Sequence, residues 1–452
     1  MSHRFFFHQA ARLLATAVSC LTLAAADELP KGQVLGKVVC AADATQSYTL
    51  YVPTSYVPGR KTPVLYCLDP GARGQVPVER FQAAAEKYGY LVAGSNNSRN
   101  GPFEQNYAAM DAMLRDTSQR YALDRQRIYL AGLSGGARVA CQIAQTGLAH
   151  GVIVCGAGFP GTEKPAAVKF AVFGTVGVDD FNYPELRRLD GELEELGVPH
   201  RIVVFAGGHE WLPAALANEA IEWLELQAMR AGLRPKDEAL VQASFQTRRD
   251  AVALLAPPGQ FLAAKSLAAD FAGLADTAEI VKRAKELAGS REVRDWKRQE
   301  QKQGNQQNEM TDELFDLAQD GRLVKLREKV DAWRKIADAL DDSAERRLMR
   351  RVLHGAYVRG SETSRAGLEA REYAQVVPML ELMAALRPER AQTFYDLAYA
   401  HARNGEKKHA VDALKQAAAA GFKDAARVAA EPAFAPLHAD AAYQAVIVAM
   451  KP

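Results

Sequence analysis

The chain has few cysteines and a net charge close to zero, and these two features exclude several classes of partner and binding site. The 452 residues include five cysteines, and the formal net charge is +2 at pH 7. A charge so close to zero gives no reason to expect a nucleic-acid partner or a membrane-surface partner. The spacing of the cysteines does not suggest a metal site, and we expect none. Export would make a disulfide possible, but the sequence cannot pair the thiols.

Long apolar runs are also scarce. The exception is residues 13–26, which are almost wholly apolar and follow the positive charges of Arg4 and Arg12. This run is shorter than the roughly 20 residues of a spanning helix, and Ala24-Ala25-Ala26 matches a small-x-small cleavage pattern. We therefore predict a signal peptide over residues 1–26 and a periplasmic or secreted protein with no stable membrane span. A membrane anchor is the alternative interpretation.

The chain has enough apolar material for more than one core. It is 48% hydrophobic and 24% charged, as in globular proteins, and its length predicts two or three domains. Between residues 31 and 233, short apolar segments alternate with helical patterns. We predict strands at 48–52, 64–68, 91–94, 128–130, 151–155, 170–173 and 201–205, and helices at 80–88, 106–121, 137–143, 184–196 and 214–229. This alternation indicates an α/β fold with a mostly parallel sheet covered on both faces.

Strand signals disappear after residue 233. The remainder is rich in Ala, Leu, Glu, Lys and Arg, which predicts consecutive helices, and the polar segment 304–308 is predicted to break two of them. Seven positions fall at the spacing of a tetratricopeptide unit: Phe394, Leu397, Ala398, Gly405, Ala410, Leu414 and Ala417. We expect a hydrolase-like domain over 27–233, a helical region over 234–385 and a tetratricopeptide-like region over 386–452. An unrelated helical hairpin is the alternative for the last.

The most informative motif is Gly132-Leu133-Ser134-Gly135-Gly136. It lies between the strand predicted at 128–130 and the helix predicted at 137–143, which is the sequence form of a nucleophile elbow. The turn is sharp, so the residues beside the serine must be small. The serine hydroxyl then lies at a helix N-terminus, where free N–H groups favour developing negative charge. We therefore predict Ser134 as a nucleophile.

A serine hydroxyl needs a histidine to take its proton and an acid to orient that histidine. His209 follows the last predicted strand, at the carboxyl-end position where open α/β sheets build their sites. The acid should lie in the loop after the strand at 170–173, where Asp179 and Asp180 both qualify. We prefer Asp180 because it immediately precedes a turn into the next helix. The other aspartate would cap that helix or bind loop backbone.

An oxyanion hole needs two N–H groups directed at the developing charge. The first is expected from Gly135 and the second from the loop after the strand at 64–68, from Ala72 or Arg73. Arg73 could instead meet an acidic substrate group or be a solvated loop residue. The polar loop 95–102 lies on the same rim and is either a substrate contact or a plain connection.

Residues 45–230 thus resemble the α/β-hydrolase superfamily, most closely its secreted esterase, dienelactone-hydrolase-like and polyhydroxybutyrate-depolymerase-like branches. The resemblance rests on the elbow, on the acid loop, and on Gly207-Gly208-His209-Glu210-Trp211. It implies hydrolysis of esters, thioesters or amides without a cofactor, with Ser134 as nucleophile, His209 as base and Asp180 as orienting acid. The oxyanion loop departs from the His-Gly form of many lipases, and no long lid insertion is evident.

Two functions fit these observations. The first is an exported serine esterase that forms an acyl-enzyme on Ser134 and acts on a small-molecule or polymeric ester. The alternative is a catalytically silent hydrolase-fold core whose helical region is a scaffold that binds a protein or peptide. The presence of Ser134, His209 and an acid favours the enzyme. The two are compatible, because the C-terminal helices could also bring the hydrolase to a protein partner.

Overall fold

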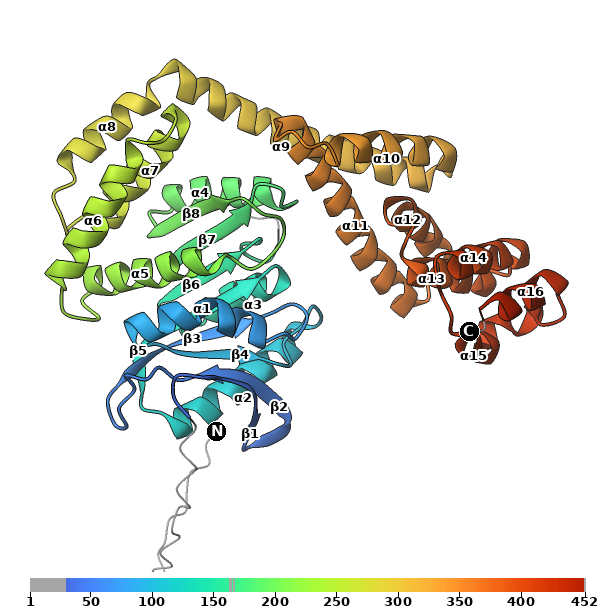
Figure 1. Cartoon of the computed structure of the whole chain (residues 1–452), viewed down its shortest axis with the longest axis horizontal. Helices are drawn as coiled ribbons and strands as arrows, with labels where there is room; N and C mark the ends of the chain where they lie inside the picture. Colours follow the sequence, from blue (N-terminus) through green and yellow to red (C-terminus); the bar gives the residue numbers. More distant parts are fainter. Residues whose placement is uncertain (1–29, 162–164, 166, 451–452) are drawn as a thin grey trace, which may run out of the picture.

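The structure is a computed structural model that describes residues 30–161, 165 and 167–450. The predicted signal peptide therefore lies outside the described residues. A layered α/β unit comes first, and the helices that follow form an arch that leaves this unit on one side and descends on the other (Figure 1). Within the described ranges, no helix is both long enough and apolar enough to cross a bilayer.

One eight-stranded sheet organises the first half, in the order β1-β2-β4-β3-β5-β6-β7-β8. The strands are β1 (Val34–Cys40), β2 (Asp43–Tyr51), β3 (Thr62–Leu68), β4 (Leu91–Ser95), β5 (Leu123–Leu133), β6 (Gly151–Cys155), β7 (Ala171–Gly177) and β8 (His200–Phe205). The β1–β2 and β2–β4 pairs are antiparallel and all others are parallel. The predicted mostly parallel sheet is confirmed. The edge strand β1 was missed because much of it is exposed, so it lacks an apolar run.

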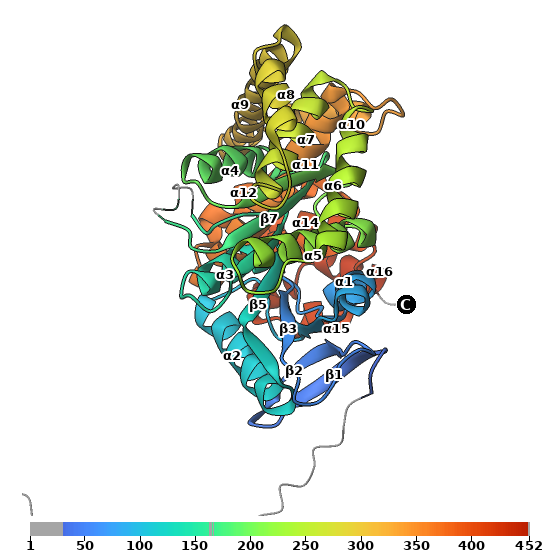
Figure 2. The ribbon, with the colours of Figure 1, turned by 90° about the vertical axis from the view of Figure 1, so that its left-hand side faces the viewer.

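Helices cover both faces of this sheet. They are α1 (Gln75–Tyr88), α2 (Phe103–Arg120), α3 (Gly135–Ala144), α4 (Tyr183–Glu195) and α5 (Ala214–Arg230). Alternate residues of β3 enter different cores: Tyr66 packs in the cluster with α2, α3 and α4, whereas Leu65 packs in the cluster with α1 and α5. In Figure 2 the two sets of helices lie on opposite sides of the strands. Burial on both faces explains why the strands read as continuous apolar segments.

The arch contains the remaining helices. They are α6 (Glu238–Val252), α7 (Pro257–Asp270), α8 (Ala278–Ala288), α9 (Arg291–Gln319), α10 (Leu323–Ala337), α11 (Ala344–Ala370), α12 (Tyr373–Leu386), α13 (Ala391–Arg403), α14 (Lys407–Ala419), α15 (Ala425–Ala430), a 3-10 helix (Pro432–Leu437) and α16 (Ala441–Ala449). The small residues Ala398 and Ala410 are fully buried where α13 and α14 pack together. The hairpin is formed as expected, and its kinship to tetratricopeptide repeats stays a prediction.

The predicted break at 304–308 is wrong, because α9 runs through it without interruption. These polar residues do not end the helix; two of them contact the first half of the chain. A Cβ on Gly304 would lie 3.5 Å from Pro184, and the buried Gln307 side chain donates to the carbonyl of Phe181 at 2.7 Å. The polarity thus reflects a contact surface.

The four cysteines of the described residues, Cys40, Cys67, Cys141 and Cys155, are buried free thiols. Burial raises the pKa of the Cys40 thiol to about 11 and that of the Cys155 thiol likewise to about 11. Thiols that stay protonated and buried behave as small hydrophobic groups rather than as metal ligands.

We expect Gly136→Ala to destabilise the fold by about 2 kcal/mol or more, because a Cβ there would lie 2.0 Å from the carbonyl oxygen of Leu68. The matched control is Gly191→Ala inside α4, where a Cβ meets nothing within 4 Å. That change should stabilise by about 0.5–1 kcal/mol through helix propensity. Urea unfolding of both variants measures the difference. Equal stability of the two would contradict the close packing at the elbow.

Candidate active site

Ser134 occupies a strained turn between β5 and α3. Its backbone has φ 54° and ψ −123°, a region that residues other than glycine rarely adopt. The turn is possible because Gly132 and Gly136 touch: a Cβ on Gly132 would lie 2.3 Å from the backbone of Gly136. Ser134 therefore precedes the first turn of α3, whose N–H groups have no partner within the helix. This is the arrangement that the sequence predicted for a nucleophile elbow.

His209 and Asp180 face each other after β8 and β7. His209 Nδ1 lies 2.9 Å from Asp180 Oδ1, and the Asp180 carboxylate also accepts the N–H of Asn182 at 2.8 Å. The Asp180 side chain is 1% exposed and that of His209 is 12% exposed. Since a carboxylate can only accept, Nδ1 carries the proton and Nε2 is left as the basic nitrogen.

Gly156 marks the point where these residues meet. A Cβ there would lie 2.7 Å from Asp180 Oδ2 and 2.9 Å from His209 Nδ1. The preceding residue, Cys155, accepts the N–H of Ser134 at 2.9 Å. The serine and the histidine–aspartate pair are thus gathered at one edge of the sheet. Across the described residues, no hydrogen bond joins the Ser134 hydroxyl to His209.

Asp179, in the same loop, has a different partner from Asp180. Its Oδ2 accepts from Arg350 Nη1 of α11 at 2.9 Å. The expectation that the second aspartate would cap the helix or bind loop backbone is therefore wrong: it forms an ion pair with the arch. The sequence could not supply this partner, because 171 positions separate the two residues.

The residues predicted to complete the oxyanion hole are engaged elsewhere. The Ala72 N–H donates to the carbonyl of Asp69 at 3.2 Å, and the Arg73 guanidinium pairs with the Asp69 carboxylate at 2.9 Å. Asp69 also accepts from the indole of Trp211 at 2.8 Å, so it ties this loop to the segment that carries His209. Neither Ala72 nor Arg73 lines the cleft around Ser134.

Asn100 lies beside Gly135 instead. A Cβ on Gly135 would lie 2.0 Å from Asn100 Oδ1, so the amide packs against the residue after Ser134. The backbone of Asn100 is held by the carbonyl of Pro70 at 2.8 Å. The polar loop 95–102 therefore reaches the rim of the candidate site. The sequence had left two alternatives for this loop, a substrate contact or a plain connection.

A cleft of about 890 Å³ opens over Ser134 and Gly135. One wall comes from the first half of the chain, through residues 99–101, the first turn of α2, and α3. The other wall comes from α9 and α11 and includes Gln307, Thr311, Asp312, Val358, Arg359 and Arg365. Sequence reasoning missed this second wall entirely. The polar run at 304–308 was its one visible signal, and it was interpreted as a break.

The same two helices hold the loop that carries Asp180. Gln307 binds the carbonyl of Phe181, and the Tyr183 hydroxyl donates to Glu300 of α9 at 2.7 Å. A Cβ on Gly355 of α11 would lie 3.1 Å from the Phe181 side chain, so the helix and the loop are in close contact. Together with the Asp179–Arg350 pair, these contacts hold the loop against α9 and α11.

His354 of α11 completes this contact. The rings of Phe181, His209 and His354 form one cluster, with centroids 4.4 Å apart for Phe181 and His209, 5.1 Å for Phe181 and His354, and 6.2 Å for His209 and His354. Burial lowers the pKa of His354 to about 4, with smaller contributions from the charges of His209 and Arg387. His354 is therefore neutral at pH 7 and packs as an aromatic group.

No protein-family model matches the chain, and a comparison with curated proteins likewise finds no match. Solved structures similar to its first part include S-formylglutathione hydrolase from Staphylococcus aureus, which is 13% identical (43% of this chain, 98% of that chain, TM-score 0.35). A ferulic acid esterase is 18% identical (42% and 96%, TM-score 0.36). Esterase 2 from Thermogutta terrifontis is 14% identical (45% and 96%, TM-score 0.34). Similarity at this level leaves any activity to be argued from the residues of this chain.

We expect the stability of the protein to fall as the pH drops from 6.5 towards 4, in part through His354. Its folded pKa of about 4 is below the unfolded value of 6.5, so in this window the unfolded chain binds more protons. The contribution is fully present above pH 6.5 and its loss amounts to about 3 kcal/mol at most. Urea unfolding at several pH values should give a flatter profile for His354→Gln than for wild type. An identical change with the exposed His150→Gln would contradict the assignment.

Proposed function

We propose that this protein is an exported serine hydrolase that cleaves carboxylic esters through Ser134, His209 and Asp180. The observation that carries the proposal is the 2.9 Å contact between His209 Nδ1 and Asp180 Oδ1, beside a serine in an elbow conformation. Export rests on the sequence of residues 1–26 alone.

In the proposed reaction, the Ser134 hydroxyl attacks the ester carbonyl while His209 Nε2 takes its proton. The alcohol leaves with that proton, and an acyl-enzyme remains on Ser134. Water then attacks the acyl-enzyme with His209 again as base, which releases the acid and restores the serine. The Ser134–His209 hydrogen bond must form when substrate binds, as is common for catalytic contacts that are long in ligand-free structures.

Stabilisation of the oxyanion is proposed to come from the first turn of α3 and from loop 95–102. The Gly135 N–H belongs to the first turn of α3, where N–H groups have no partner within the helix, and it lies next to the nucleophile. The second donor predicted from sequence was Ala72 or Arg73, but both are directed at Asp69. The side-chain amide of Asn100 packs on Gly135 with its oxygen nearer than its nitrogen, so we propose that the amide turns over when substrate binds and donates from Nδ2.

The arch is proposed to act in catalysis and not only in partner binding. It supplies one wall of the cleft and holds the loop that carries Asp180. These contacts favour an enzyme over the alternative of a silent core with a separate scaffold. Small-molecule and polymeric esters both fit an open cleft, and a protein partner for the C-terminal helices remains a prediction.

We expect the mature protein to hydrolyse short-chain p-nitrophenyl esters and Ser134→Ala to lose at least about 10³-fold in kcat/KM. The serine should also react with a fluorophosphonate, and this labelling should disappear in the variant. The measurement is initial rates together with gel fluorescence, with circular dichroism to establish that both proteins are folded. Folded wild-type protein that neither turns over esters nor is labelled would favour the scaffold function.

The two aspartates provide a matched pair of variants. Asp180→Asn should lower kcat/KM by about 10²–10⁴-fold, because an amide cannot hold the required His209 tautomer. Asp179→Asn removes the pair with Arg350, whose side chain is 37% exposed, and should cost less than tenfold. The measurement is the initial rate of each variant, corrected for the residual rate of Ser134→Ala, and it shows which aspartate orients His209. A larger loss in Asp179→Asn would reverse the assignment of the acid.

A further inference from the structure

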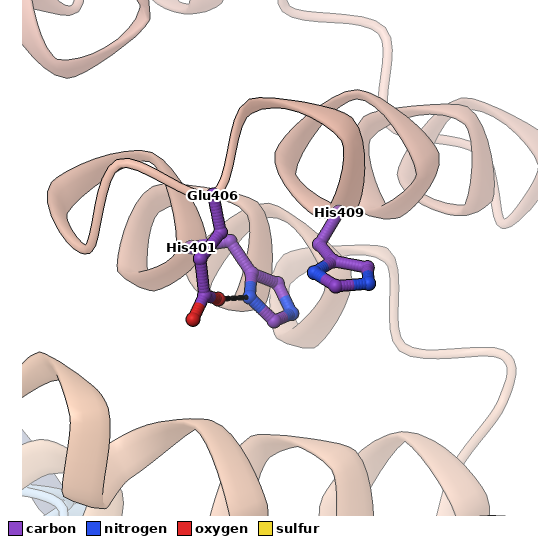
Figure 3. Close-up of side chains that lie close together, drawn as sticks. All are labelled: His401, Glu406 and His409. Carbon is purple, nitrogen blue, oxygen red and sulfur yellow. Dashed lines mark hydrogen bonds and ion pairs between the residues drawn. The ribbon is translucent and has the colours of Figure 1, made fainter.

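A second cluster of reactive side chains lies far from Ser134, at the turn between α13 and α14. His401, Glu406 and His409 each offer a side-chain nitrogen or oxygen, and these atoms all lie within 4.8 Å of one another. In the portion of the chain that the structure describes, it is the one group of at least three His, Cys, Asp or Glu residues arranged in this way. Figure 3 shows the ring of His409 next to the His401–Glu406 pair.

The turn itself brings the first two residues together. Gly405 has a φ of +79°, the Gly405 N–H donates to Ala402, and the Glu406 N–H donates to the carbonyl of His401. This is the Schellman pattern that ends a helix, in which the third residue from the helix end contacts the residue after the glycine. That contact is usually between two apolar side chains. Here it is between His401 and Glu406.

The Glu406 carboxylate is not used to start the next helix. Glu406 is the N-cap of α14, but its side chain makes no capping hydrogen bond. Instead Glu406 Oε2 lies 2.5 Å from His401 Nδ1. His409 is the third residue of α14, and helical side chains tilt towards the helix N-terminus. This tilt directs its ring back towards the other two, and the ring centroids of His401 and His409 are 5.2 Å apart.

We propose that His401, Glu406 and His409 form a binding site for a divalent transition-metal ion of the zinc type. Two imidazole nitrogens and one carboxylate oxygen are donors that Zn²⁺ favours in proteins, and water would complete a tetrahedral set. Such donors are about 3.3 Å apart around the ion. Separations within 4.8 Å therefore need only small side-chain rotations. The sequence did not predict this site, because the spacing of the cysteines does not suggest a metal site and the site contains no cysteine.

The surroundings favour a preformed site. His401 is 7% exposed and anchored in the packed hairpin, whereas Glu406 and His409 are exposed and leave the outer side open to an ion and to water. Ala400 and Ala410, next to the ligands in sequence, are fully buried, so the two helix ends are held at fixed positions. The bound ion would link α13 to α14 and stabilise the hairpin.

The test is calorimetric titration of the tag-free, EDTA-treated mature protein with ZnCl₂. Wild type is expected to bind one equivalent. His409→Ala should bind at least tenfold more weakly, since its exposed ring can be removed without disturbing the hairpin core. Glu406→Gln should also bind more weakly. The matched control is His438→Ala, an exposed histidine of the same helical region outside the cluster, which should bind as wild type does.

Thermal melting monitored by circular dichroism establishes that each variant is folded, and Zn²⁺ should raise the Tm of wild type more than that of His409→Ala. Co²⁺ provides a second readout, because tetrahedral coordination produces visible absorption. Absence of saturable one-to-one binding in wild type would overturn the proposal, as would equal affinities of His409→Ala and His438→Ala. Esterase activity is not part of this test, so its outcome is independent of the proposed function.

Discussion

The two halves of the molecule meet at consecutive aspartates that bind different partners. Asp180 contacts His209, and Asp179 pairs with Arg350 of α11. One short loop after β7 therefore joins the candidate catalytic pair to the helical arch. Any displacement of α11 moves the loop, and the orientation of His209 depends on the loop. The position of the arch is thus a condition for the geometry of the site.

The ion pair alone cannot hold this arrangement. The Arg350 side chain is 37% exposed, and pairs of this kind contribute about 1 kcal/mol or less. Most of the stabilisation must come from the enclosed contacts: the hydrogen bond of Gln307 to the Phe181 carbonyl, the packing of the Phe181 ring with the two imidazoles, and the close approach of Gly355. These depend on shape, so their removal leaves buried polar groups unpaired or leaves a cavity. The Arg350 pair orients Asp179, and the packed contacts stabilise the position of the loop.

Every strand of the first half except the edge strand β1 could be predicted from sequence, because the signals are local. Buried parallel strands read as short apolar runs, and the glycines at 132 and 136 fit the sharp turn between a strand and a helix. The preference for Asp180 agrees with the observed contact to His209. The position after the strand fitted Asp179 equally well, and only the turn into the next helix favoured Asp180.

The arch resisted prediction because its role depends on contacts across long sequence distances. Gln307 looks like a helix breaker in a polar run, and only the presence of Phe181 126 positions away explains it. His354 looks like an ordinary histidine on a helix until Phe181 and His209 are placed beside it. The partners of Ala72 and Arg73 could not be foreseen either, because the pairing depends on the rotamer of Asp69.

A cleft built from two parts of the chain has a consequence for the proposed esterase. Residues 99–101, the first turn of α2 and α3 provide one wall, but the opposite wall is set by α9 and α11. That wall carries arginines, carboxylates and amides, and an apolar acyl pocket would not use such residues. Selectivity for the ester would then depend on residues that take no part in the chemistry. The nucleophile and its base can stay unchanged while substitutions on two exposed helix faces alter which substrate reaches them.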